Sequence, residues 1–311
     1  MNPSAVFASS SVAVRTSKNL ITKNHIRNML NALTATDAAK ILEEIDYNRE
    51  ILATKPEDDD AIIASERERT VKTFRELCGD PALLYCVMAK YDYHNIKTLY
   101  MARGGKPHNS NETLYPFAVR TFDANRLPIP LRSAIRNTEA KSKVTAAEID
   151  IAIDHALYQD ITEHIAKIKT KSIADYFRTE IDIVNLRTFL KCRTLKTDAQ
   201  DYFVKGGMLK PQALKQATSG DENAGEELRG TPYYKMALYP MDAFESSAAD
   251  LLVKKSATDK NNINTLAPLF RWYVLKQEEF KAVKVLLMGK RLGFGKDKIR
   301  DNLGGLYDRF E

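Results

Sequence analysis

Three acidic side chains stand at matching places in three long helical segments, and they are the first groups to consider for chemistry. They are Asp92, Asp182 and Glu279. Carboxylates that lie together can serve as general acids or bases. Acids carried by three separate units would lie far apart unless the units converged on one axis. We therefore expect these acids to have a structural role, and we set a catalytic cluster aside as the less favoured alternative.

The acids belong to a pattern that occurs at 91–99, at 181–189 and, more faintly, at 278–286. In its full form an acid is followed by an asparagine, an aliphatic residue and a base. Its positions in chain order are Asp92, Asn95, Ile96, Lys97, Asp182, Asn185, Leu186, Arg187, Glu279, Val283 and Lys284. Repetition at this scale indicates architecture before it indicates an active site. A buried amide must find hydrogen-bond partners, so we expect Asn95 and Asn185 to fix the register between packed segments.

Other arrangements that could do chemistry are incomplete. The glycine-rich stretch 289–297 lacks the spacing, the Ser or Thr and the preceding strand of a phosphate-binding loop, so we expect it to end a long helix. No histidine pair has metal-binding spacing, and the acidic stretch 57–60 suits a helix N-terminus better than a calcium loop. The sequence predicts no catalytic residue, no cofactor and no metal.

The three cysteines, Cys78, Cys86 and Cys192, form no CxxC pair. An odd number without such spacing argues against a disulfide framework and against a zinc site. We expect reduced, mostly buried thiols in a cytosolic protein.

Composition narrows the class of protein. The chain has 311 residues, 44% of them hydrophobic, which is enough for a sizeable core. Its net charge is +6, but the basic residues are spread along the chain and interleaved with acids, whereas a nucleic-acid groove more often shows a clustered stripe. The N-terminus does not resemble a signal peptide, and the longest apolar run, 82–89, is far shorter than the roughly 20 residues that span a bilayer.

Helical periodicity dominates the chain, and the only hint of a strand is weak, at 11–15. Ser17 or Thr22 could cap an early helix, Thr36 could start the next, and Thr145 opens a capping-box match. We expect the principal helices at 84–99, 145–161, 173–193, 242–254, 263–290 and 296–303, with irregular connections at 104–111 and 127–130, a glycine pair at 206–207 that closes the second long helix, and a linker at 219–225. The sequence thus predicts an all-α fold of three related units, 1–120, 121–218 and 219–311.

In their order and spacing, these features resemble the C subunit of the V-type and A-type rotary ATPases, which is called the d subunit in the eukaryotic vacuolar enzyme. The likeness covers nearly the whole chain. It is carried by 12–15 with Leu20 and Ile21, by 36–42 with Asp46 and Tyr47, by the repeated pattern on the long helices, and by the ending from Glu278 through 288–290 and 298–303 to Tyr307. Two places depart from the family: 282–284, where it usually has Asn-Leu-Arg, and the connection 104–130.

The resemblance implies a non-catalytic funnel of three helical units around a pseudo-threefold axis. Its partners would be the central shaft subunits, of D and F type, and the membrane proteolipid ring, of c or K type. The funnel would sit peripherally on the cytoplasmic face of the membrane, where it would couple ATP-driven rotation to proton or sodium transport. A basic all-helical scaffold for nucleic acid stays the alternative.

Overall fold

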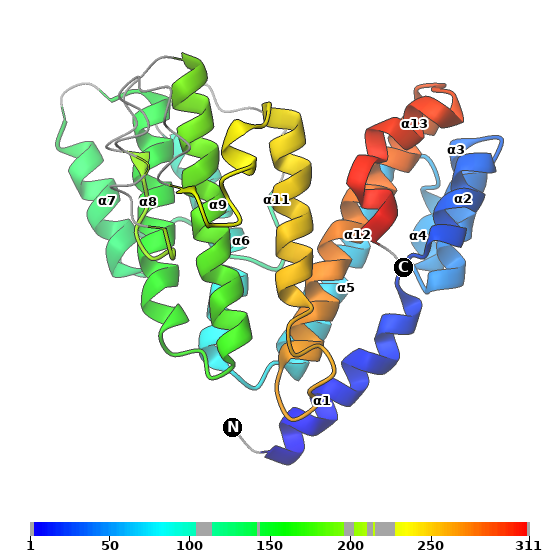
Figure 1. The fold of residues 1–311 in the computed structure, drawn as a ribbon, viewed down its shortest axis with the longest axis horizontal. Helices are drawn as coiled ribbons and strands as arrows, with labels where there is room; N and C mark the ends of the chain where they lie inside the picture. Colours follow the sequence, from blue (N-terminus) through cyan, green and yellow to red (C-terminus); the bar gives the residue numbers. More distant parts are fainter. Residues whose placement is uncertain are drawn as a thin grey trace. The chain divides into compact units, whose positions relative to one another are not determined.

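The structure is a computed structural model that describes residues 3–103, 114–141, 144–195, 202–209, 214 and 228–309. Within these residues it contains helices, turns and loops but no strand, which confirms the all-α prediction. The helices are α1 (Pro3–Thr16), η1 (Ser17–Asn19), α2 (Lys23–Asn31), α3 (Ala35–Lys40), η2 (Ile41–Ile45), α4 (Arg49–Thr54), α5 (Asp59–Leu77), α6 (Pro81–Arg103), α7 (Ile129–Glu139), α8 (Ala146–Ile165), α9 (Lys171–Leu195), η5 (Met236–Leu238), α11 (Met241–Ser256), α12 (Ala267–Arg291), α13 (Lys296–Leu303) and η6 (Gly304–Arg309) (Figure 1).

The chain divides into two compact units. One combines Met1–Gly79 with Ala249–Glu311, and the other is Asp80–Ala248. The first unit therefore joins both ends of the chain. The three related units predicted from the sequence stay a prediction.

Helix α12 is the centre of the first unit, where it packs against α1, α5, α13, α3 and α2 (Figure 1). Apolar side chains of α12 such as Val283 and Leu286 meet Ile26, Met29 and Leu42 from the N-terminal helices in one buried cluster. Burying such side chains contributes roughly 1.5–3 kcal/mol each. The N-terminal helices are thus held to the C-terminal helix by a shared core.

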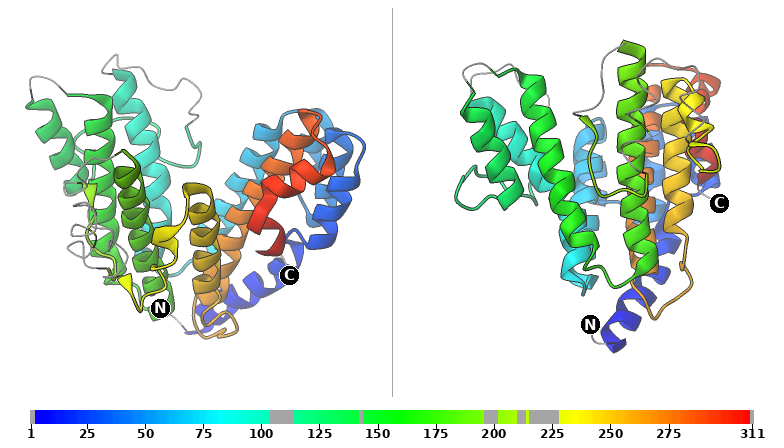
Figure 2. Two further views of the ribbon diagram at one scale, coloured as in Figure 1. Left: turned by 45° about the horizontal axis from the view of Figure 1, so that its top comes forward. Right: turned by 60° about the vertical axis from the view of Figure 1, so that its left-hand side comes forward.

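Helix α8 is the centre of the second unit, with α6, α7 and α9 packed against it (Figure 2). The longest helices of this unit, α6 and α9, carry the first two copies of the repeated pattern. Lys90 of α6 and Glu180 of α9 form an ion pair that joins these two helices directly.

Local capping signals are confirmed at several helix starts. Thr145 forms the expected capping box with Glu148 at the start of α8, and Thr22 forms one with His25 at the start of α2. Asp58 accepts a hydrogen bond from the Ala61 amide, so the acidic stretch does begin a helix, α5. The cap of α3 is Thr34, two residues before the expected start.

Two regions are more helical than predicted, one wholly and one in part. The weak strand hint at 11–15 is wrong, because these residues lie in α1, where Val6, Ser10 and Ala13 are buried at helical spacing. The irregular connection expected at 127–130 ends in the first turn of α7, in which proline is compatible with helix because that position needs no amide hydrogen. The start of α12 also falls later than expected, at Ala267.

The turn between α12 and α13 forms as predicted. Helix α12 ends at Arg291, Gly293 has a φ of +71°, and Gly295 precedes α13. A positive φ is easily adopted by glycine, which explains why this stretch ends a helix. The expected linker 219–225 and connection 104–111 lie outside the described residues.

Candidate functional site

The second copy of the pattern uses buried polar side chains to bind a returning loop. The Asn185 Oδ1 accepts the Val204 amide at 2.8 Å, and its Nδ2 donates to the Val204 carbonyl at 2.8 Å. Asp182 accepts the Leu209 amide at 2.8 Å and the Tyr233 hydroxyl at 2.9 Å. Both side chains are almost fully buried, so each of these bonds replaces water that cannot reach the site.

The glycine pair at 206–207 belongs to this loop, and the expectation that it closes the helix is wrong because the described residues 203–205 directly before it are not helical. A Cβ added to Gly207 would lie 2.0 Å from the Asp182 Oδ1, and Gly206 has a φ of +109°. The two glycines instead allow the loop to approach the carboxylate closely.

The first copy makes the same kind of contact. Asn95 accepts the Tyr115 amide at 2.8 Å and donates to the carbonyls of Tyr115 and Val119. Asp92 accepts the Val119 amide at 2.9 Å. In both copies, then, an amide and an acid on a long helix bind the backbone of a segment that follows in the chain.

Burial shifts the pKa values of Asp182 and of its partner Tyr233. Desolvation raises the pKa of Asp182 above its usual value, although the hydrogen bonds from Leu209 and Tyr233 oppose this shift. The pKa of Tyr233 is also raised, first by burial and then by the Asp182 charge. Both oxygens of Asp182 bind groups of the protein's own chain, so this acid serves the fold.

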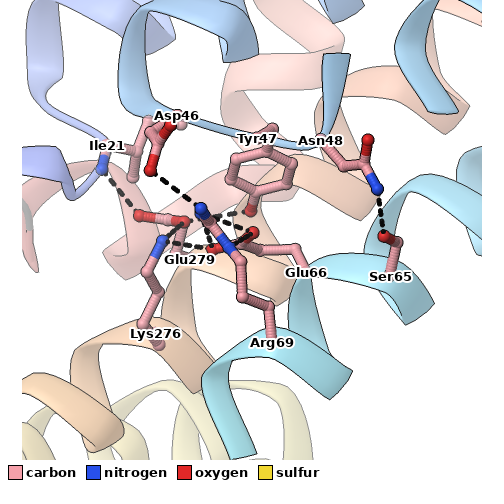
Figure 3. Close-up of polar contacts among 9 residues, drawn as sticks. All are labelled: Ile21, Asp46, Tyr47, Asn48, Ser65, Glu66, Arg69, Lys276 and Glu279. Atoms are coloured by element: carbon pink, nitrogen blue, oxygen red, sulfur yellow. Dashed lines mark hydrogen bonds and ion pairs between the residues drawn. The ribbon is translucent and has the colours of Figure 1, made fainter. Parts of the chain in front are cut away.

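The third acid, Glu279, lies at the centre of a buried polar cluster in the first unit (Figure 3). One of its oxygens accepts the Ile21 amide at 2.7 Å, and the other accepts the Tyr47 hydroxyl at 3.0 Å. The Lys276 ammonium donates to Glu279 at 2.8 Å and to Glu66 at 2.9 Å. The two carboxylates on this lysine come from different helices, α12 and α5.

Arginine extends the cluster toward its outer side. Arg69 binds both oxygens of Glu66 and reaches Asp46 at 2.8 Å (Figure 3). Burial lowers the pKa of Lys276, but the charges of Glu279 and Glu66 outweigh it, and the pKa stands above its usual value. Burial, together with the Glu279 and Glu66 charges, raises the pKa of Tyr47 well above its usual value. The lysine is therefore charged and the tyrosine neutral at physiological pH.

Each base of the pattern pairs with an acid on a neighbouring helix. Lys97 lies 3.3 Å from Asp150 and 3.6 Å from Asp154 of α8. Arg187 binds Glu245 of α11 through two nitrogens. Lys284 lies 3.1 Å from Asp60 of α5, and both of these side chains are exposed, so this pair contributes little to stability.

The structure places the three sets of pattern residues on three different helices, α6, α9 and α12. Their aliphatic members Ile96, Leu186 and Val283 are buried core residues. The partners of the acids, Lys276 above all, were not predicted from the repeated pattern. The spacing of Lys276 and Glu279, three residues apart on a largely apolar helix, was the one indication in the sequence of the polar cluster around Glu279.

Replacing Asn185 with leucine is expected to lower the free energy of unfolding by about 2–4 kcal/mol, because it leaves the buried amide and carbonyl of Val204 without partners. Urea unfolding followed by circular dichroism measures this loss. The control, Asn137→Leu, makes the same change at an exposed position of α7 and should stay within about 0.5 kcal/mol of the unmodified protein. An equal effect of the two substitutions would show that the Asn185 amide does not hold the loop.

Further features bear on the class of protein. Cys78, Cys86 and Cys192 are buried free thiols, as expected. Among the described residues, no group of three or more His, Cys, Asp or Glu side chains could hold a metal ion. In the same part of the chain, no helix has both the length and the apolar character needed to cross a membrane.

These observations define an all-α protein in which the buried side chains of Asp182, Asn185 and Glu279 bind the backbone and side chains of the same chain. The sequence profile of the ATP synthase (C/AC39) subunit family matches residues 13–302, and the chain belongs to this family. It is therefore a non-catalytic, peripheral subunit of a membrane ATPase complex of the V type.

Two curated relatives span almost the same length. Both are the C subunit of the V-type ATP synthase, from two strains of Thermus thermophilus. The first is 23% identical over 316 residues, which cover 93% of this chain and 95% of the relative. The second matches with the same identity and coverage. The alternative of a nucleic-acid scaffold finds no support in these comparisons.

Proposed function

We propose that this protein is the socket of a rotary ATPase, which couples the central shaft to the membrane proteolipid ring. In this role it turns with the rotor and passes rotation driven by ATP hydrolysis into the ring, which moves protons or sodium ions. The observation that carries the proposal is the family match, which extends over residues 13–302.

The packing within each unit supports a mechanical role. Long helices are joined side by side through buried apolar cores and through polar groups with partners on other segments, as at Asn185 and Glu279. Close-packed interiors of this kind have low compressibility and transmit strain. A coupler must not deform under torque, and such packing suits that requirement.

The finer arrangement is part of the same proposal. Three related helical units, 1–120, 121–218 and 219–311, surround a pseudo-threefold axis as a funnel. The funnel receives the shaft subunits of D and F type and seats on the c- or K-type ring at the cytoplasmic face of the membrane. Asp92 and Asp182 each accept a backbone amide from a later segment of the chain, and these matching contacts support a relation between the proposed units 1–120 and 121–218.

Copurification tests the proposed partners. An affinity-tagged form of the full chain, recovered from detergent-solubilised membranes of cells that express it, should bring with it both the shaft subunits and the proteolipid, identified by mass spectrometry. Nuclease treatment before elution serves as the control for the nucleic-acid alternative and should remove nothing. Recovery of ATPase head subunits without shaft and proteolipid would contradict the socket.

A further inference from the structure

We propose that residues 17–54, which the division made from the sequence places in the first unit 1–120, instead complete the C-terminal repeat as its closing segment, attached to α12 through Glu279. The closing segment comprises η1, α2, α3, η2 and α4. The inference uses the predicted repeat of the long helices but is independent of the socket function.

The acids of the pattern point to this role. Asp92 and Asp182 each accept a backbone amide from a segment 27 residues further along the chain. Glu279 also accepts a backbone amide, but its donor is Ile21, which lies 258 residues earlier. The same type of contact is thus made on α12 by a segment from the opposite end of the chain.

A second contact repeats in the same way. Asp182 accepts the hydroxyl of Tyr233 on its other oxygen, and Glu279 accepts the hydroxyl of Tyr47 on its other oxygen. The asparagine position of α12 is occupied by Ala282, which is fully buried in the core shared with the closing segment. On α12 apolar packing therefore replaces the amide, and the polar attachment is made by the acid together with Lys290, which donates to the carbonyls of Leu30 and Ala32 at 2.6 Å.

The charges around Glu279 make this attachment sensitive to a single substitution. Three acids, Glu279, Glu66 and Asp46, pair with two bases, Lys276 and Arg69, and the first two acids and the lysine are almost completely buried. Neutralising Glu279 removes one of the two carboxylates that pair with the buried Lys276, and losing a partner of a buried charge is destabilising. Both oxygens of Glu279 accept hydrogen bonds, one from the Ile21 amide and one from the Tyr47 hydroxyl. In Glu279→Gln an NH2 group takes the place of one oxygen, and this group cannot accept either bond.

Hydrogen–deuterium exchange of the full chain, read by mass spectrometry, tests the proposal. In Glu279→Gln the amides of residues 17–54 should exchange about 100-fold faster, while those of α6, α8 and α9 keep their rates. In Tyr47→Phe, which removes one donor only, the same segment should exchange about 10-fold faster. Glu76→Gln, the same change at an exposed position of α5, is the matched control and should change neither.

The proposal is overturned if the closing segment keeps its exchange rates in both variants. It is equally overturned if residues 17–54, α5 and α12 accelerate by one common factor, because the substitution would then weaken the whole unit instead of releasing a segment. Should Glu279→Gln fail to fold, the milder Tyr47→Phe variant decides between these outcomes.

Discussion

Replacing Lys276 with methionine is expected to lower the free energy of unfolding of the first unit by about 3–5 kcal/mol. The ammonium of Lys276 lies between the carboxylates of Glu66 and Glu279, and all three side chains are at most 2% exposed. Without the lysine, the buried Glu279 charge loses its ammonium partner and faces Glu66, which Arg69 still pairs. The apolar stem of methionine fills a similar volume, so the loss reports the missing charge rather than a cavity.

The single tryptophan gives a local measurement of this effect. Trp272 is buried on α12, one turn before Lys276, and the chain contains no other tryptophan. Its fluorescence during urea unfolding therefore follows the first unit. The control is Lys284→Met on the same helix, where the side chain is 56% exposed, its partner Asp60 is also exposed, and a change within about 0.5 kcal/mol is expected.

A double variant separates charge from packing. In Lys276→Met with Glu279→Gln, Glu66 remains as the buried carboxylate of this cluster, and Arg69 still pairs with it through two hydrogen bonds. We expect the double variant to be more stable than Lys276→Met alone, which is a coupling between neighbours of the kind that double-mutant cycles detect. Additive losses would show that the two side chains do not act as one cluster.

Local features of the fold could be predicted because their causes are local. The caps at Thr22 and Thr145 and the glycine turn between α12 and α13 each depend on a few adjacent residues, and all three form as expected. The strand hint at 11–15 failed because alternating small and branched residues fit α1 equally well once Ser10 and Ala13 are buried. Tertiary burial decided between two local options there.

The polar clusters could be predicted only in part. The sequence indicated that Asn95 and Asn185 would need partners, and the structure supplies them from the backbone of later segments. It could not indicate that Glu279 binds Ile21 and Tyr47, because those contacts join residues more than 200 positions apart. Such pairs form only because the two ends of the chain pack together. No local pattern in a single sequence predicts that packing.

The largest functional effect is expected when this protein is removed from the assembled complex. A socket that joins shaft and ring is required for coupling but not for ATP hydrolysis in the soluble head. Complexes reconstituted into vesicles without the protein should therefore hydrolyse ATP and carry out no ATP-driven ion transport. Adding back the purified full chain should restore transport.

The ratio of ions transported to ATP hydrolysed, measured in such vesicles with and without the protein, shows whether rotation passes through this subunit. The proposed socket predicts that this ratio falls to background without the protein and returns when the protein is added back. An unchanged ratio in vesicles that lack the protein would contradict the claim that rotation passes through it.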